Sequence, residues 1–429
     1  MGPKKPEIEY IHLRRIFELR KAKDPPQEYT EAYECLRKLA QGAMKKGPFT
    51  VTNGKTAPHI AASGDPRDFL SYAPYWWPEE KNGKVNYVRR DGKRNPDCKL
   101  VQDQSQLEGL AENLTYLCLG YYLLGKPEYG NHAVSLIDAF FVNDKTKMNP
   151  HVEYGQVVRG ANNPTGKGRA EGIISTRFLA RVVNVLPLLQ DHEAYTAVSQ
   201  PVRAWFSDYL RWLLESSIGK KEAATKNNHY TFYLVQTTSI QQFLQPENRD
   251  GVRSIENYFN VTLPKQVDPN TGNQPLEANR TKPFHYLEFN LHAALFLGEL
   301  AIDAGCNVYS HHQLIPLATT YMVGCCKPDM KEDMTEGVRT VEIVKSRYGD
   351  TNDSCYTNFL ENARRCKDAE NLSGPKHAIA RLWFYHENGQ QCSPSTSSSS
   401  SSSSSSNGSH HHKGSRTKAF LNKLLHRNK

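Results

Sequence analysis

The sequence predicts an all-α fold in which helical hairpins form an (α/α) toroid, an incomplete barrel, with long functional loops. Apolar residues recur at i, i+3 and i+4 spacing in many separate segments, whereas alternating strand patterns are few and short. The chain has no short internal repeat, which favours paired helices arranged in a ring over a solenoid of identical units. Such a ring leaves a groove across one end, walled by loops.

The segments with helical spacing cover most of the chain. The clearest of them ends at Gly125, and glycine is typical of helix C-termini. Two helices are expected in the first 50 residues, separated by Asp24-Pro25-Pro26, because proline interrupts a helix. The expected helices are Tyr10–Ala22, Tyr29–Met44, Leu107–Leu124, His132–Phe141, Ile173–Leu189, Val202–Leu214, Tyr230–Phe243, Phe289–Ala304 and His377–Tyr385.

The chain divides into one large domain and a tail of different composition. Residues 1–391 contain all the expected helices of the domain, and a short further stretch with helical spacing, Phe420 to Leu425, lies in the tail. Residues 392–412 include unbroken serine from Ser397 to Ser406, which cannot bury enough apolar surface to order itself and is expected to be a flexible linker. Residues 413–429 are basic and are interpreted as a solvated tail or as a short amphipathic helix at an anionic surface.

The formal net charge of +9 does not indicate a nucleic-acid partner. Six Lys or Arg residues and no Asp or Glu lie after residue 392, so the rest of the chain carries only +3. No apolar run approaches the roughly 20 residues that a bilayer span requires, so no membrane span is expected. Residues 1–6 lack the hydrophobic core of a signal peptide, so the protein stays inside the cell unless the sequence lacks a leader.

The nine cysteines do not predict a metal site. They are widely spread, without a CxxC pair or zinc-finger spacing, and the tract His410–His412 is too short to argue for a metal. Their odd number rules out complete pairing, but one or two disulfides between Cys306 and Cys392 are expected if the protein is exported. The sequence leaves the oligomeric state open.

The segment from Asn227 to Gln236 is the strongest candidate for the chemistry. It follows a polar, poorly periodic stretch and opens a helix, so Asn228 and His229 are expected at a helix N-terminus, a place suited to a carboxylate. His229, Tyr233 and Gln236 share one helix face. The alternative is that one of the two asparagines only caps the helix and that His229 is a hydrogen-bonded, partly buried histidine.

A long segment without helical periodicity, from Phe49 to Lys99, contains groups that bind sugars. Tyr72, Tyr75, Trp76 and Trp77 offer flat apolar faces for stacking on pyranose rings. Arg90 and its neighbouring arginines offer guanidinium groups for carboxylates. The alternative for the two tryptophans is that they pack under the loop as core.

A second polar loop runs directly into an apolar helix and contains Arg280, His285 and Tyr286. Arg280 is suited to bind a carboxylate through two parallel hydrogen bonds, and Tyr286 to transfer a proton if a nearby cation lowers its pKa from about 10. The alternative is that Arg280 pairs with Glu277 on the surface while Tyr286 packs at the helix start.

Together, Asn228, His229, Arg280 and Tyr286 form the set that β-elimination of a uronic acid requires. Removal of the C5 proton places negative charge on the C6 carboxylate, which the enzyme must neutralise while supplying a base at C5 and an acid at O4. Amide, imidazole and guanidinium groups serve the first task, and tyrosine or histidine the other two. Such a site requires no metal and no organic cofactor.

Six motifs, spanning roughly residues 50 to 300, resemble the ordered motifs of the alginate lyase superfamily. The loop with two tryptophans is more similar to the branch that contains glucuronan lyases than to the periplasmic mannuronate lyases of bacteria. The motifs are Tyr72-Ala73-Pro74-Tyr75-Trp76-Trp77-Pro78, Arg90-Asp91-Gly92 with Asn95-Pro96, Asn149 to Gln156, Gly168-Arg169 with Gly172-Ile173-Ile174, Asn227-Asn228-His229, and Arg280 to Tyr286.

The resemblance implies that residues 1–391 form a toroidal catalytic domain that cleaves a polyuronate by β-elimination. It implies catalytic roles for Asn228, His229, Arg280 and Tyr286, with His285 as a rival to Tyr286 because the Arg-to-Tyr spacing differs between branches. An anionic polysaccharide is the expected partner, and export is the expected localisation. The resemblance places substrate binding at Tyr72, Tyr75, Trp76, Trp77, Arg90, Gln156, Arg169 and Tyr233.

Two alternatives belong to other functional classes. A glycoside hydrolase on the same kind of toroid would use paired carboxylates, for which Asp91, Glu153 and Glu171 are candidates. A non-catalytic carbohydrate-binding protein would use the tryptophan loop alone. The residues Tyr230 to Leu234 also depart from the family pattern, in which a small residue and an aspartate are expected, so the groove or its supporting bonds are expected to differ.

Overall fold

Four mainly apolar helices, each packed against the next in chain order, form the interior of the fold. They are α3 (Asp103–Leu124), α5 (Leu179–Val185), α8 (Asn228–Leu244) and α12 (Pro283–Asp303). The structure is a computed structural model that describes residues 8–21, 27–310, 313–326 and 330–383. The expected serine-rich linker and basic tail lie outside the described residues.

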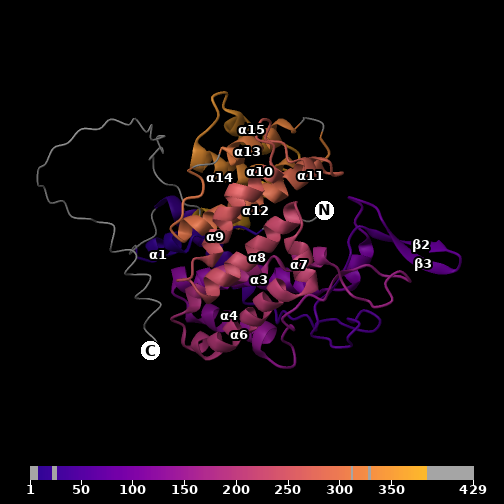
Figure 1. Cartoon of the computed structure of the whole chain (residues 1–429). Helices are drawn as coiled ribbons and strands as arrows, with labels where there is room; N and C mark the ends of the chain where they lie inside the picture. Colours follow the sequence, from indigo (N-terminus) through magenta and orange to yellow (C-terminus); the bar gives the residue numbers. More distant parts are fainter. Residues whose placement is uncertain (1–7, 22–26, 311–312, 327–329, 384–429) are drawn as a thin grey trace, which may run out of the picture. The chain divides into compact units, whose positions relative to one another are not determined.

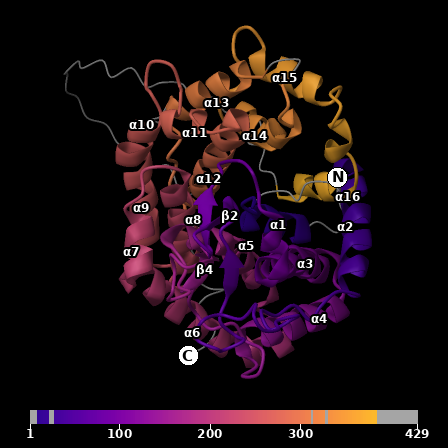
Figure 2. The same cartoon turned by 90° about the vertical axis from the view of Figure 1, so that its right-hand side faces the viewer.

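The other helices pack around this row and, with it, form the predicted (α/α) toroid, which Figure 2 shows end-on. The ring is closed where the last short helices pack against α2, far away in sequence. These helices are α1 (Leu13–Lys21), α2 (Thr30–Ala43), α4 (Pro127–Ile137), α6 (Glu193–Glu215), α7 (Ser217–Ala223), α9 (Asp250–Asn257), α10 (Leu263–Gln266), α11 (Pro275–Ala278), α13 (Leu314–Gly324), α14 (Val338–Tyr348), α15 (Cys355–Ala363) and α16 (Pro375–Ala378).

Short 3-10 and π-helical turns join many of these helices. They are η1 (Gln27–Tyr29), η2 (Pro96–Leu100), η3 (Asp138–Val142), η4 (Ala170–Thr176), η5 (Leu186–Leu189), η6 (Tyr258–Thr262), η7 (Met334–Gly337), η8 (Ala369–Leu372) and η9 (Ile379–Leu382). The expected helix Ile173–Leu189 is divided among η4, α5 and η5. Pro187 contributes to the break because it has no backbone N–H to continue the helix.

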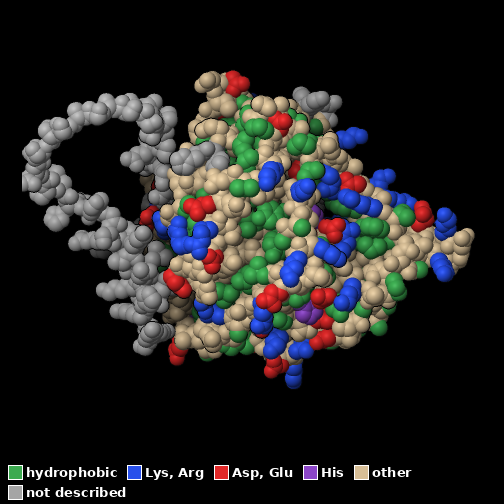
Figure 3. Space-filling model, viewed as in Figure 1, with side chains coloured by type: hydrophobic (Ala, Val, Ile, Leu, Met, Phe, Trp, Pro, Cys, Tyr) green, Lys and Arg blue, Asp and Glu red, His purple; other side chains and the backbone are tan. Residues whose placement is uncertain are grey.

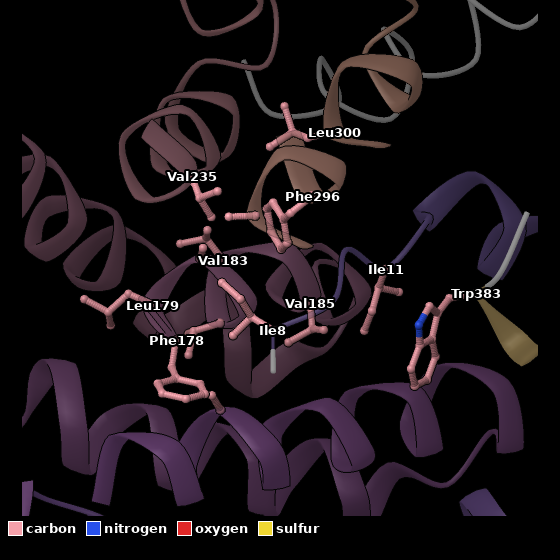
Figure 4. Packing of buried hydrophobic residues seen from close by; sticks show 14 of the residues in the cluster. Ile8, Ile11, Phe178, Leu179, Val183, Val185, Val235, Phe296, Leu300 and Trp383 are labelled. Atoms are coloured by element: carbon pink, nitrogen blue, oxygen red, sulfur yellow. The ribbon is translucent and has the colours of Figure 1, made fainter. Parts of the chain in front are cut away.

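The apolar core joins the inner helices to one another (Figure 4). Val183 of α5, Val235 of α8 and Phe296 of α12 are all nearly inaccessible to solvent and belong to one continuous cluster. Burial of such a side chain stabilises a fold by about 1.5–3 kcal/mol. Because this core fixes the inner helices, the side chains at their ends keep a constant separation.

The start of the described chain is part of this core rather than of a helix. The expected helix from Tyr10 begins only at Leu13. The N–H of Ile11 donates to the side-chain oxygen of Asn184, and the Asn184 amide donates back to the Ile11 carbonyl. These two bonds use the backbone groups of Ile11 in place of helical bonds, and they hold Ile11 in the interior seen in Figure 4.

Strands occur where the sequence predicts only irregular structure. β1 (Leu70–Tyr72) pairs in parallel with β4 (Tyr154–Val157), and β2 (Trp76–Lys81) pairs antiparallel with β3 (Lys84–Arg89). The turn between β2 and β3 consists of Asn82 and Gly83, both with positive φ, as a tight hairpin turn requires. The β2–β3 hairpin projects from one end of the ring (Figure 1), and the site is built around its base.

Two further expectations are tested by the described residues. By length and composition, residues 170–189 could cross a membrane, so the expectation that no apolar stretch approaches the length of a bilayer span is wrong. However, 78% of the most apolar window in this stretch is buried inside the fold. The eight described cysteines are free thiols, so none of the five between Cys306 and Cys366 forms the disulfide expected of an exported protein; Cys392 is outside the described residues. No group of three metal-ligating side chains occurs among the described residues.

Candidate active site

The start of α8 lies where the sequence predicts it. Asn227 is the N-cap, and its side-chain oxygen accepts a hydrogen bond from the N–H of His229 at 3.3 Å. Asn228 is therefore inside the helix and does not act as the cap. Its amide is available for another role, and the first turn presents both Asn228 and His229 at the end of the ring.

A buried carboxylate fixes the His229 ring. The Nδ1 atom of His229 lies 2.7 Å from Oε1 of Glu222, which is fully buried at the end of α7. Burial raises the pKa of Glu222, although the hydrogen bond and charge of His229 oppose this shift. The contact occupies Nδ1 and sets the orientation of the ring, so the chemistry of the imidazole falls to Nε2.

Glu222 is a residue that the sequence analysis missed. It lies in the stretch after Ser216 that shows no clear periodicity, yet Ser216 caps a helix there by accepting the N–H of Gly219. The capping serine, followed by six residues that include two lysines and a glutamate, was the available signal. Nothing in the local sequence indicates that Glu222 contacts His229.

A second buried carboxylate holds Asn228. Glu277 of α11 accepts the backbone N–H of Asn228 at 2.8 Å and its side-chain amide at 2.7 Å. Burial raises the pKa of Glu277, while the bonds from Asn228 and the nearby charges of Arg280 and His229 lower it. Glu277 therefore ties the α8 terminus to the loop that carries Arg280, two segments about 50 residues apart in the sequence.

Arg280 pairs with Asp91, not with Glu277. Its Nε and Nη2 atoms donate to the two oxygens of Asp91 at 3.2 and 2.9 Å. This pair lowers the pKa of Asp91. The alternative of a surface pair between Arg280 and Glu277 is wrong, because Asp91 approaches from the base of the β2–β3 hairpin and Glu277 is buried against Asn228.

Tyr286 lies against this ion pair. The guanidinium carbon of Arg280 is 3.8 Å from the centre of the Tyr286 ring, and the Tyr286 hydroxyl is 2.9 Å from the hydroxyl of Tyr75. Burial and the neighbouring Tyr75 raise the pKa of Tyr286 well above its usual value near 10, and the Arg280 cation opposes that rise. Tyr286 is thus a neutral phenol at physiological pH.

His285, the rival to Tyr286, faces a different group of residues. Its Nδ1 atom lies 2.8 Å from Oε2 of Glu336 in η7, and its ring stacks on Phe289 with centroids 5.8 Å apart. The ring contacts Tyr286 edge-on at 5.1 Å. Arg280 contacts Tyr286, and Asp91 acts on Tyr286 electrostatically, so the structure groups Tyr286 with the other candidates.

The two tryptophans of the aromatic loop lie on opposite faces of the hairpin. Trp76 pairs with Arg89 and Trp77 with Val88, and successive residues of a strand point to opposite faces. Trp76 lies under the guanidinium of Arg169, at 5.8 Å from the ring centre. Trp77 donates its indole N–H to the Lys93 carbonyl at 2.7 Å, and Arg90 lies 5.8 Å from its ring.

Three of the expected substrate-binding residues have mainly structural contacts. Tyr72, the last residue of β1, is buried in a small apolar cluster with Leu70 and Val157, and its hydroxyl lies 2.9 Å from Nδ1 of His59. Tyr233 is buried in α8 and donates to the Leu213 carbonyl at 3.1 Å. Gln156 of β4 has a positive φ of 49° and donates its backbone N–H to Ser71 at 2.8 Å.

The three carboxylates that a hydrolase would need are each paired with a cation. Asp91 binds Arg280, Glu153 lies 3.6 Å from Lys167, and Glu171 lies 2.6 Å from Arg169. A general acid of a glycosidase needs a raised pKa, whereas that of Asp91 is lowered. The pairing of Asp91, Glu153 and Glu171 with cations gives no support to an acid–base pair formed by these three carboxylates.

The site as a whole consists of three groups of direct contacts. Arg169 lies over Trp76, the buried Glu222 and Glu277 bind His229 and Asn228, and Arg280 joins Asp91 to Tyr286, which contacts Tyr75. Electrostatic interactions of Glu222 with Arg169 and of Glu277 with Arg280 link the three groups. Lys and Arg side chains gather over α7, α11 and the hairpin (Figure 3). A surface of this charge favours an anionic ligand.

The mostly helical fold, together with the family match that follows, places the chain among the polysaccharide lyases. The chain belongs to the alginate lyase family, whose sequence model matches residues 54–321. A search of curated protein sequences found no match.

Two alginate lyases are among the solved structures that resemble the chain. The crystal structure of an alginate lyase from Bacteroides ovatus has 26% sequence identity and a TM-score of 0.74, and the match covers 89% of this chain and 100% of that one. Alginate lyase A1-III from Sphingomonas species A1 has 12% identity and a TM-score of 0.47, covering 88% of this chain and 95% of the other.

Proposed function

We propose that this protein is a lyase that cleaves a β-1,4-linked polyuronate, mannuronan or glucuronan, by β-elimination. The reaction leaves an unsaturated uronate at the new non-reducing end. The observation that carries the proposal is the position of Tyr286, whose ring lies against Arg280 and whose hydroxyl contacts Tyr75. Family membership supports the reaction class, and the basic surface supports a polyanionic substrate.

The elimination moves one proton from C5 and returns one to O4. The C5–H electron pair forms the C4–C5 double bond while the C4–O4 bond breaks, so the leaving oxygen needs a proton as it departs. In mannuronate and glucuronate, H5 and O4 are on the same face of the ring. Tyr286 first loses its phenolic proton to solvent. As a phenolate it then takes the C5 proton and donates that proton to O4, which regenerates the phenolate.

Arg280 prepares Tyr286 for the first of these steps. Burial holds the tyrosine neutral, so the phenolate must be stabilised when substrate is bound. The guanidinium against the ring supplies a fixed positive charge, and Asp91 holds that guanidinium through two hydrogen bonds. Because Arg280 is engaged by Asp91, its main role is to stabilise the charge on Tyr286 rather than to bind the substrate carboxylate.

Asn228 and His229 are left to neutralise the C6 carboxylate. Glu277 and Glu222 hold these two side chains from the buried side, so both donors are oriented before substrate binds. The positive end of the α8 dipole adds to the attraction for a carboxylate in the first turn. Charge that develops on the carboxylate in the transition state is then met by preorganised donors.

Ultraviolet absorbance tests the proposal directly, because the C4–C5 double bond of the product absorbs where the substrates do not. Purified protein would be incubated separately with polymannuronate and with glucuronan. A rise with either polymer identifies a lyase and names its substrate. The absence of a rise with both, in protein shown to be folded by circular dichroism, would contradict the proposal; a saturated product would instead indicate hydrolysis.

A further inference from the structure

The first turn of α12 is not closed by its own residues. Pro283 has no N–H, and the Tyr286 N–H makes the first bond of the helix, to the Lys282 carbonyl at 3.1 Å. Phe284 and His285 lie between these two positions, where the N–H groups of a helix need a capping acceptor. Lys282 is the N-cap, but its side chain forms no capping hydrogen bond. The acceptor for these two N–H groups therefore has to come from another segment.

Glu332, which lies after α13 in the sequence, supplies this acceptor. Its Oε1 atom accepts the N–H of Phe284 at 3.2 Å, and its Oε2 atom accepts the N–H of His285 at 2.9 Å. Both bonds are charge-assisted, and the carboxylate lies at the positive end of the α12 dipole. Glu332 thus caps α12 from a segment 47 residues away from His285 in the sequence.

The segment that carries Glu332 has bonds of its own. Asp333 is the N-cap of η7, and its Oδ1 atom accepts the N–H of Thr335 at 2.9 Å. The Asn371 amide donates to Oδ2 of Asp333 at 2.9 Å. The buried Phe284 packs against Gly337 of η7, where an added Cβ atom would lie 2.9 Å from the Phe284 ring. The capping carboxylate is therefore held in a fixed place beside α12.

The capped turn determines where the Tyr286 side chain lies. Tyr286 follows directly after Phe284 and His285, so its backbone belongs to the same turn. Its ring lies against Arg280 and its hydroxyl contacts Tyr75, and neither of these partners belongs to α12. Fraying of this turn would therefore move the phenol away from both partners.

We propose that Glu332 is a positioning residue for the elimination, which caps α12 and so fixes the Tyr286 phenol against Arg280. The inference rests on the proposed function and adds a requirement for a residue that does not touch the substrate. Glu332 lies beyond residues 54–321, the part of the chain that the family's sequence model matches. The motifs in that part therefore give no indication of this cap.

The cap should affect the chemical step more than substrate binding. Asn228 and His229, which we assign to the substrate carboxylate, lie on α8 and are held there by Glu277 and Glu222. Glu332 bonds to neither of these carboxylates or their partners among the described contacts. Displacement of a reacting group by about 1 Å can lower a rate roughly 100-fold. Loss of the cap should therefore lower kcat and leave KM nearly unchanged.

Kinetics and hydrogen exchange of Glu332→Ala and Glu332→Gln test this inference, because glutamine keeps one acceptor oxygen and alanine keeps none. The substrate is whichever of polymannuronate and glucuronan the wild type cleaves. We expect kcat to fall roughly 10- to 100-fold for alanine and less for glutamine, while KM changes less than about threefold. Amide exchange in a peptide spanning Phe284 to Leu287 should accelerate in the same order. The control Glu361→Ala removes an exposed carboxylate of α15 that pairs with Arg365, and it should change neither measurement.

The outcomes separate the inference from the proposed function. If the wild type forms no unsaturated product from either polymer, the proposed function is contradicted and this inference with it. If the wild type is active and both Glu332 variants keep its kcat, the inference alone is contradicted, whatever their thermal stability. Unchanged amide exchange would contradict the cap, and a rise in KM with kcat unchanged would show an effect on binding instead. Should Glu332→Ala not fold, Glu332→Gln must still show a lowered kcat with KM nearly unchanged.

Discussion

The guanidinium carbon of Arg280 lies 3.8 Å from the centre of the Tyr286 ring, and Asp91 holds the guanidinium through two hydrogen bonds. Asp91 and Arg280 are separated by 189 residues in the sequence. This stacking gives the buried tyrosine a fixed positive neighbour, which is the property that a phenol needs to act as a base.

Replacing Tyr286 by phenylalanine should abolish the elimination while the fold survives. The ring and its packing against Arg280 are kept, and only the hydroxyl that contacts Tyr75 is removed. Loss of an acid–base group lowers the rate by roughly 10²- to 10⁴-fold. Initial rates of absorbance increase measure the effect, and thermal melting checks the fold. Full activity in folded protein would contradict the catalytic role of Tyr286 and favour His285 as the proton-transfer residue.

The rate should rise with pH across the range in which the protein stays folded. The pKa of Tyr286 lies well above 10, so the phenolate fraction increases about tenfold for each pH unit below it. The Asp91→Asn variant holds Arg280 less firmly, because the ion pair is lost. Its kcat should therefore fall by a larger factor than its KM rises. The pH profiles of wild type and variant measure both effects. A rate that is independent of pH from 7 upward would contradict a tyrosine base.

Replacing Glu222 by glutamine should lower activity through His229. The amide keeps the size of the side chain but replaces the charged acceptor at Nδ1 with a neutral group that can also turn its NH2 toward the ring, so the imidazole is oriented less firmly. We expect a fall in kcat of roughly tenfold or more with a smaller change in KM. An unchanged kcat together with lowered thermal stability would show that Glu222 is purely structural.

Glu299, a buried residue away from the site, makes the stability of the fold depend on pH. Burial raises its pKa, but His12 at 2.6 Å and Arg347 at 2.5 Å outweigh that effect and lower it to about 2 from a usual value of 4.5. Because its pKa is lowered in the folded state, the ionised carboxylate of Glu299 stabilises the fold fully above pH 4.5. This contribution is lost as the pH falls toward 2. Glu299→Gln should therefore cost about 3 kcal/mol at pH 7 and progressively less below pH 4.5.

Urea denaturation at a series of pH values measures this difference. The free energy of unfolding of the wild type should fall on acidification more steeply than that of the variant. Arg253→Gln is a suitable control, because Arg253 forms an exposed i,i+3 pair with Asp250 on α9 and such pairs contribute little. Parallel pH dependences for wild type and Glu299→Gln would contradict the lowered pKa.

The sequence by itself determined the helical toroid and the start of the critical helix. Local spacing is sufficient for these features, because an amphipathic helix is recognised from its own residues and Asn227 caps α8 through a bond to His229 two residues later. The order of the six motifs also indicated the family to which the chain belongs. The hairpin of β2 and β3 was missed, since its Trp-Trp-Pro and charged segments do not alternate clearly between apolar and polar residues.

Only the tertiary structure decided which residues act on one another. Glu222 binds His229, Glu277 binds Asn228 and Asp91 binds Arg280. The separation of Trp76 and Trp77 onto opposite faces likewise depends on the strand pairing that places Arg169 over one of them. Side-chain contacts between distant segments follow from how the helices pack in the ring, and packing depends on the whole core rather than on any local pattern.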